Sequence, residues 1–170
     1  MVTSVQQEAS RPMVHQRQPD EYTCWITVVA MLADIPVEQL LAEIREEFGA
    51  SYQEMWMGDI TEVASWAEGR FGFNINPRKR DHVRPDVMAD RLRTLMKAVK
   101  LYSLPSGRGA ISLVVPGFRI DDQNVYRLQK HTVAYSDGMV YDPSSRKPMS
   151  LAQFRHEFAK CLIDQTWEVR

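Results

Sequence analysis

Apolar and polar positions along the chain change their period about two thirds of the way through. Up to about residue 100 the apolar residues recur at the three- and four-residue spacing of amphipathic helices. After residue 108, short runs of β-branched and aromatic residues alternate with turn sequences, as strands do. Helices followed by strands, rather than alternating with them, predict an α+β fold with a helical N-terminal half packed on a C-terminal antiparallel sheet.

The run WITVVAMLA predicts the central helix of this fold, because it is apolar nearly all round and therefore typical of a buried helix. The helix is expected to begin near Thr23 or Cys24, with Thr23 as its N-cap. Asp34 and Pro36 are expected to end it.

Three further helices are expected in the first hundred residues. One opens with Pro36 at its first helical position and ends at Gly49. Another covers about residues 59–71 and ends at Gly72. A last one follows a basic loop or edge strand at residues 74–86, and its inner face carries Met88, Leu92, Leu95, Met96 and Val99.

The C-terminal seventy residues predict a sheet with one helix. AISLVVP is a short β run, and KHTVAY and MVYD form a hairpin across Asp137 and Gly138, which are favoured turn residues. SLAQFRHEF predicts a helix capped by Ser150, and CLIDQTWEV a closing strand in which Cys161 is a core residue.

Composition narrows the class of protein. A chain of 170 residues predicts one domain, which we place at residues 14–170 after a flexible tail at residues 1–13. A net charge of -1 gives no indication of nucleic acid or an anionic membrane as partner. The longest apolar run, nine residues, is too short to cross a bilayer, which needs about 20. With two cysteines and no visible signal peptide, we expect a cytoplasmic protein or one exported without a cleaved signal peptide.

Cys24 is the first residue that could carry chemistry. It lies at the expected start of a buried helix, where unpaired N–H groups and the helix dipole favour a thiolate. A thiolate is the nucleophile of cysteine catalysis. A lone cysteine is more often a small buried core residue, but a place directly after a polar loop favours the catalytic interpretation.

His131 and Asp142 are the second candidate group. If Asp137 and Gly138 form a two-residue turn, Val133 faces Asp142, so that His131 and Asp142 share one face of the sheet as diagonal neighbours. A carboxylate in that place can orient an imidazole whose other nitrogen acts on a thiol. A surface histidine and a turn aspartate before Pro143 are the simpler alternative.

Gln18 lies six residues before Cys24, in the loop that leads into the helix. Taken alone it is a solvated loop residue. A side-chain amide at this spacing could nevertheless reach back beside the thiol and stabilise an oxyanion together with the N–H of Cys24.

The order of these residues resembles that of papain-like cysteine peptidases. The resemblance rests on Gln18, Cys24-Trp25, His131 and Asp142-Pro143, and the expected elements around them cover residues 14 to 160. The most similar branches are the bacteriocin-leader-processing peptidase domain and the avirulence cysteine-protease effectors of plant-pathogenic bacteria, which also place Trp after the nucleophile.

The resemblance implies a role for each of these residues. Gln18 would be the oxyanion donor, Cys24 the nucleophile, His131 the general base and acid, and Asp142 the residue that orients the imidazole. The chain departs from the pattern in two places: many bacteriocin-processing relatives have Gly-Pro after the nucleophile, and eleven residues is a short His–Asp separation. Asp137, at the hairpin tip, is a weaker alternative to Asp142.

Three classes of function remain open. The first is hydrolysis of a peptide or isopeptide bond, for which the family likeness suggests small residues such as Gly at the cut. The second is glutamine deamidation or transglutaminase-like chemistry on a side-chain amide with the same site. The third is a papain-like binding module without activity, which the complete set of four residues disfavours.

Partners and cofactors follow from the preferred function. We expect a protein or peptide substrate, no cofactor, no metal, no nucleic acid and no membrane; the oligomeric state is left open. The remaining features have simple explanations: the four tryptophans as core or half-buried residues rather than a substrate cleft, and the basic residues Arg78, Lys79, Arg80 and Arg84 as a solvated loop rather than a site for an acidic partner. A zinc site from Cys24, His131, His156 and Cys161 is disfavoured because the sequence has no zinc-binding spacing.

Overall fold

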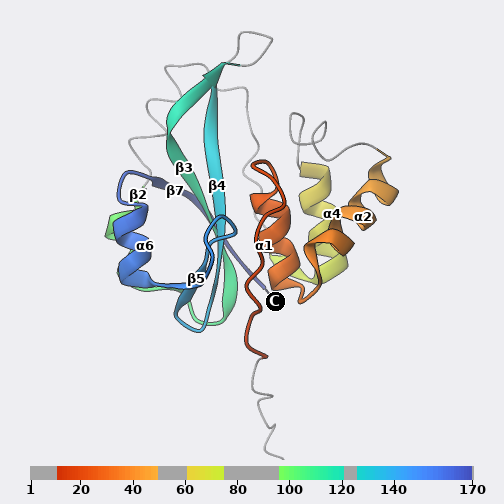
Figure 1. The fold of residues 1–170 in the computed structure, drawn as a ribbon, viewed down its shortest axis with the longest axis horizontal. Coiled ribbons are helices and arrows are strands. Elements are labelled where there is room, and N and C mark those ends of the chain that lie inside the picture. The colour runs from red at the N-terminus through yellow and green to blue at the C-terminus, as the bar shows by residue number, and fades with distance from the viewer. Residues whose placement is uncertain (1–10, 50–60, 75–95, 121–125, 170) are drawn as a thin grey trace, which may run out of the picture.

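A computed structural model describes residues 11–49, 61–74, 96–120 and 126–169, and it has the expected α+β architecture (Figure 1). Its elements follow each other in the order α1 (Cys24–Leu32), α2 (Val37–Phe48), α4 (Thr61–Phe71), β1 (Phe73–Asn74), β2 (Met96–Lys97), the 3₁₀ turn η1 (Ala98–Lys100), β3 (Arg108–Ile120), β4 (Tyr126–Ser136), β5 (Met139–Tyr141), β6 (Met149–Ser150), α6 (Leu151–Glu157) and β7 (Leu162–Val169).

The described strands form one seven-stranded sheet in which every pairing is antiparallel. The strand order is β1-β7-β3-β4-β5-β6, and β2 also pairs with β7. The long strands β3 and β4 lie at the centre, with β7 beside β3. The sheet therefore has its longest ladder where β4 carries His131.

Two hydrophobic cores lie on opposite faces of this sheet. One core contains α1, α2 and α4 packed on Ala110, Ala134 and Trp167. The other contains Phe154 of α6 packed on residues such as Val133 and Tyr135, which alternate with the first set along the strands. Figure 1 shows the sheet between α6 and the three N-terminal helices.

α1 is the central element of the helical core, as its all-apolar sequence predicts. All nine of its residues are buried, and it packs against β4, β3 and α2. Its C-terminal end is held on the sheet by Arg108, whose two terminal nitrogens each lie 2.8 Å from a carboxylate oxygen of Asp34. Because the Arg108–Asp34 ion pair holds the C-terminal end of α1 at the start of β3, the N-terminal end with Cys24 lies farther along the sheet, toward the middle of β4.

The β4–β5 hairpin has the predicted two-residue turn. Asp137 and Gly138 both have positive φ, 51° and 76°, as the tight hairpin turn that matches strand twist requires. Ser136 pairs with Met139 and Ala134 with Tyr141, which is the predicted register. Extending it by one residue places Asp142 opposite Val133.

Several other local predictions are confirmed. Gly49 and Gly72 follow α2 and α4 with φ of 65° and 71°. Ser150 caps α6 through a capping box with Gln153, and the closing strand β7 is present.

Thr23 is the N-cap residue of α1, as predicted, although its hydroxyl bonds to Asp20 and not to an N–H of the helix. Two other local predictions are wrong in detail. Pro36 is the N-cap of α2 rather than its first helical residue. Met13, which we assigned to the tail, is 5% exposed and belongs to the helical core.

The fourth predicted helix does not reach its expected end. Met96 lies in β2 and Val99 in η1, because residues 96–97 pair with β7 and this pairing overrides the local helical pattern. The rest of that helix, the start of the third one and the basic residues at 78–84 lie outside the described residues.

None of the described helices is long and apolar enough to span a membrane by itself. α1 and α2 meet the length and hydropathy criteria only together, as a pair bent by 109°, and α1 is buried in the core described above.

Candidate active site

Cys24 is the first residue of α1, and its side chain is buried in the fold at 3% exposure. The loop before it is braced by Asp20, whose carboxylate accepts a hydrogen bond from the Tyr22 N–H at 2.8 Å and whose backbone bonds to the Thr23 hydroxyl. Thr23 in turn accepts from the N–H and the hydroxyl of Thr27. The first N–H groups of a helix have no intrahelical acceptor, so the thiol sits beside free donors.

His131 lies on β4 at a point that β5 no longer covers, since the pairing of the two strands spans residues 134–136. The imidazole Nε2 lies 2.8 Å from Oδ1 of Asp142, and the Cys24 side chain is near enough to the ring to raise its pKa. Because Nε2 is used by Asp142, Nδ1 is the ring nitrogen left for a contact with the Cys24 thiol. Phe158 stacks on the imidazole, with centroids 5.9 Å apart and planes 16° apart.

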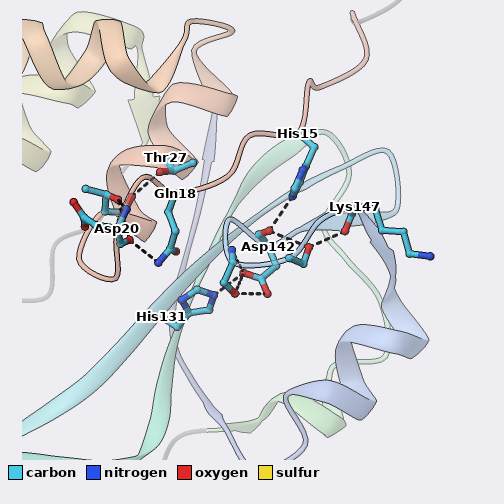
Figure 2. Close-up of polar contacts among 10 residues, drawn as sticks. His15, Gln18, Asp20, Thr27, His131, Asp142 and Lys147 are labelled. Atoms are coloured by element: carbon cyan, nitrogen blue, oxygen red, sulfur yellow. Dashed lines mark hydrogen bonds and ion pairs between the residues drawn. The ribbon is translucent and has the colours of Figure 1, made fainter.

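The Asp142 carboxylate is held on several sides (Figure 2). Oδ1 accepts from His131 Nε2 and from the Ser144 N–H at 2.9 Å. The Ser144 hydroxyl lies 2.7 Å from Oδ1 and 2.9 Å from Oδ2, so its single hydrogen is shared between the two carboxylate oxygens. A carboxylate with every oxygen bonded has one orientation, and here that orientation faces His131.

The three side chains therefore come together from both faces of the sheet. His131 and Asp142 share the face that packs on α6, in agreement with the register of the hairpin. Cys24 belongs to α1, which packs on the opposite face. His131 lies on β4 beyond the part that pairs with β5, and the thiol reaches it from the other face of the sheet.

Contacts within this group shift the pKa values of His131 and Asp142. Burial would lower the pKa of His131, but the hydrogen bonds and charges of Asp142 and Cys24 outweigh it and raise the pKa to about 9. Burial would raise the pKa of Asp142, but the bonds from His131 and Ser144 outweigh it, and the pKa lies below its ordinary value. At neutral pH the imidazole is protonated, because Asp142 and Cys24 both favour its charged form.

Gln18 lies close to this group but is only partly free to act on it. Its backbone N–H donates to the carbonyl of Pro143 at 2.9 Å, which ties the loop to the residue after Asp142. Its Nε2 donates to the carbonyl of Asp20 at 2.8 Å, and its Oε1 is buried with no partner among the described residues. A side-chain amide has two N–H groups, so the second one can serve an oxyanion.

Similarity to known proteins gives no separate assignment of this site. No family model, curated protein or solved structure shows significant similarity to the chain. The geometry places a thiol beside an imidazole that is hydrogen-bonded to a carboxylate, an arrangement that can activate a thiol for attack on a carbonyl carbon.

The sequence alone did not identify three residues that contact the site: Ser144, Phe158 and His15. Ser144 could have been found, because a serine two residues after an aspartate often bonds to its carboxylate in a turn. Phe158 follows the last helix and gives no local sign of its contact with His131. His15 donates from Nε2 to the backbone carbonyl of Asp142 at 2.9 Å, across 127 residues of chain.

The other candidates lie elsewhere in the fold. Asp137 is at the hairpin tip, where it bonds to Ser136. Cys161 is buried in the α6 core, and burial raises the pKa of its thiol. Trp25 and Trp167 stack in the helical core and Trp66 is partly buried beside it, whereas Trp56 lies outside the described residues. Within the parts of the chain that the structure describes, no three His, Cys, Asp or Glu residues group as metal ligands would.

Proposed function

We propose that the protein is a papain-like cysteine peptidase that hydrolyses a peptide or isopeptide bond through a thioester on Cys24. The observation that carries the proposal is the place of the Cys24 side chain beside His131, whose Nε2 is hydrogen-bonded to the buried Asp142 carboxylate. Packing alone would not require a buried histidine to have a carboxylate beside one ring nitrogen and a thiol beside the ring.

Each side chain has one task in this reaction. The Cys24 thiolate attacks the carbonyl carbon, and the carbonyl oxygen takes up the negative charge beside the N–H of Cys24 and the second N–H of Gln18. His131 Nδ1 then gives its proton to the leaving amine, and the thioester remains. Water, deprotonated by the same nitrogen, attacks the thioester and releases the acid and the free thiol.

Asp142 keeps the imidazole in the productive tautomer throughout. An ionised carboxylate can only accept, so His131 Nε2 carries its hydrogen toward Asp142 and Nδ1 is the nitrogen that exchanges protons. The lowered pKa of Asp142 supports this role, because the group stays ionised over the pH range in which the thiol works.

Labelling of the thiols tests the nucleophile. The folded protein is treated with a substoichiometric iodoacetamide probe near neutral pH, and the modified cysteine is mapped by mass spectrometry. We expect Cys24 to react because it lies at the start of α1 beside His131, and Cys161 to be spared because burial raises the pKa of its thiol. Preferential labelling of Cys161 would contradict the assignment, and His131→Ala is expected to slow the labelling of Cys24.

Cleavage of a proteome-derived peptide library tests the reaction class. The wild type and Cys161→Ala are expected to produce new peptide termini, whereas Cys24→Ala, which replaces one small buried side chain by another, is expected to produce none. Peptides in which a glutamine becomes glutamate without a cut would identify a deamidase using the same site. Cleavage that persists in Cys24→Ala would rule the proposal out.

A further inference from the structure

The segment at residues 13–18 connects the helical layer to the loop that carries Asp142, and we call it the strap. Met13 is buried in the helical core. The Gln16 side chain bonds to the carbonyl of Ile35 at 2.7 Å and accepts from the N–H of Val37 at 2.8 Å, at the corner between α1 and α2. Gln18 bonds to the carbonyl of Pro143. The strap is thus fixed at both ends.

His15 lies between these two attachments, and its Nε2 is 2.9 Å from the backbone carbonyl oxygen of Asp142. A carbonyl only accepts, so Nε2 carries a hydrogen; both the neutral ring with hydrogen on Nε2 and the charged ring satisfy this condition. The ring also lies against Tyr141, with centroids 6.4 Å apart. In Figure 2 Asp142 lies between His15 on one side and His131 on the other.

The Asp142 carbonyl oxygen needs His15 to complete its bonding. It has two lone pairs, and one accepts from the Ser145 N–H at 3.0 Å. The Ser145 hydroxyl lies 3.1 Å away but has a shorter contact, 2.7 Å, with the carbonyl of Lys147, which takes its single hydrogen. The second lone pair is therefore filled by His15. Asp142 is 4% exposed, so little water could replace that donor.

We propose that His15 is a positioning residue, which holds the backbone of Asp142 so that its carboxylate is aimed at His131. The inference rests on the proposed function, since it matters for activity only if Asp142 orients a catalytic imidazole. Without the donor on His15, the Asp142 carbonyl keeps the bond from the Ser145 N–H but loses its second donor, and the Asp142–Pro143 peptide is freer to rotate. That rotation carries the carboxylate with it and lengthens its contact with His131.

The test measures the pKa of His131 by NMR of the ¹⁵N-labelled imidazole in the full chain, with the signals assigned by their loss in His131→Asn. His15→Phe keeps a ring against Tyr141 but removes the donor. His15→Gln places an amide N–H near the position of Nε2. Val14→Ala is the matched control, because Val14 is adjacent in the strap and 69% exposed. His15→Ala replaces His15→Phe if the phenyl ring prevents folding.

The expected shifts differ among the variants. Asp142→Ala lowers the pKa of His131 by about 1–3 units, the range for losing a neighbouring opposite charge. His15→Phe lowers it by a fraction of that amount, His15→Gln returns it close to the wild-type value, and Val14→Ala leaves it unchanged. In the Asp142→Ala background, His15→Phe has no further effect, because the group through which it acts is gone.

Failure of this inference is distinguishable from failure of the proposed function. If Asp142→Ala lowers the pKa of His131 but His15→Phe does not, His15 is not a positioning residue and the catalytic group stands. An effect of His15→Phe that is equally large without the Asp142 carboxylate would also overturn the inference. If Asp142→Ala itself leaves the pKa unchanged, the proposed role of Asp142 is wrong as well.

Discussion

His131 and Asp142 are eleven residues apart, and a hydrogen bond of 2.8 Å joins Nε2 of one to Oδ1 of the other across the end of a hairpin. The tight turn at Asp137 and Gly138 fixes this relationship, because a register slip of one residue would move one partner to the opposite face of the sheet. The hairpin therefore determines both the distance between the two groups and the tautomer of the imidazole.

The two residues of this bond are expected to differ in their importance for activity. His131→Ala removes the proton carrier, whereas Asp142→Ala leaves an imidazole that is in the right pose less often. We expect Asp142→Ala to lower kcat less than His131→Ala, with KM similar in both, measured on any peptide found in the cleavage library. A larger loss in Asp142→Ala would contradict the orienting role.

Gln18→Ala tests the oxyanion role. Loss of one such donor costs about 2.7–4 kcal/mol in the barrier, or about a hundred- to a thousandfold in kcat. The rate of Cys24 alkylation should stay near that of the wild type, because alkylation forms no oxyanion. Gln39→Ala on α2, where Gln39 bonds to Glu43, is the matched control and should leave both rates unchanged. Wild-type cleavage by Gln18→Ala would exclude the role.

The raised pKa of His131 predicts a pH dependence of stability. The native state binds the imidazole proton of His131 more tightly than the unfolded state, in which the imidazole titrates near 6.5. The protonated imidazole therefore stabilises the fold fully below pH 6.5, and this stabilisation is lost as the pH rises through about 9. The difference in unfolding free energy between wild type and His131→Asn, measured with denaturant, should therefore shrink between pH 6 and pH 9.5. A difference that grows over this range would contradict the assigned shift.

Two glycines give a paired prediction about stability. A Cβ on Gly109 would lie 2.2 Å from the backbone oxygen of Trp167 and 2.4 Å from the Tyr135 hydroxyl, so Gly109→Ala should destabilise the fold by about 1–3 kcal/mol. A Cβ on Gly69, in the exposed part of α4, meets nothing within 4 Å. Gly69→Ala should raise stability by about 0.5–1 kcal/mol. Thermal unfolding measures both, and equal effects would contradict the packing at Gly109.

The parts of the fold that could be predicted from sequence are those fixed by local patterns. The apolar run after Cys24, the turn at Asp137 and Gly138 and the cap at Ser150 each depend on neighbours within a few residues. The face shared by His131 and Asp142 was also predictable, since side chains alternate along a strand and the turn sets the register.

The remaining features depend on contacts between distant parts of the chain. Residues 96–97 have a helical pattern and become a strand because β7 offers them a pairing edge. His15 reaches Asp142, and Phe158 reaches His131, only once the strap and α6 are docked. Sequence spacing contains no sign of either contact, because neither belongs to a repeating local pattern.

The two halves of the site, on opposite faces of the sheet, come from distant parts of the chain, and this separation sets when the site can form during synthesis. Cys24 leaves the ribosome more than a hundred residues before His131 and Asp142, and β7, which completes the centre of the sheet, follows later still. At about 5–20 residues per second, roughly 5–20 seconds pass between the synthesis of Cys24 and that of His131. On the proposed function, the growing chain lacks during that interval the imidazole that would activate Cys24, so neither it nor the neighbouring chains on the same message are exposed to the activated cysteine.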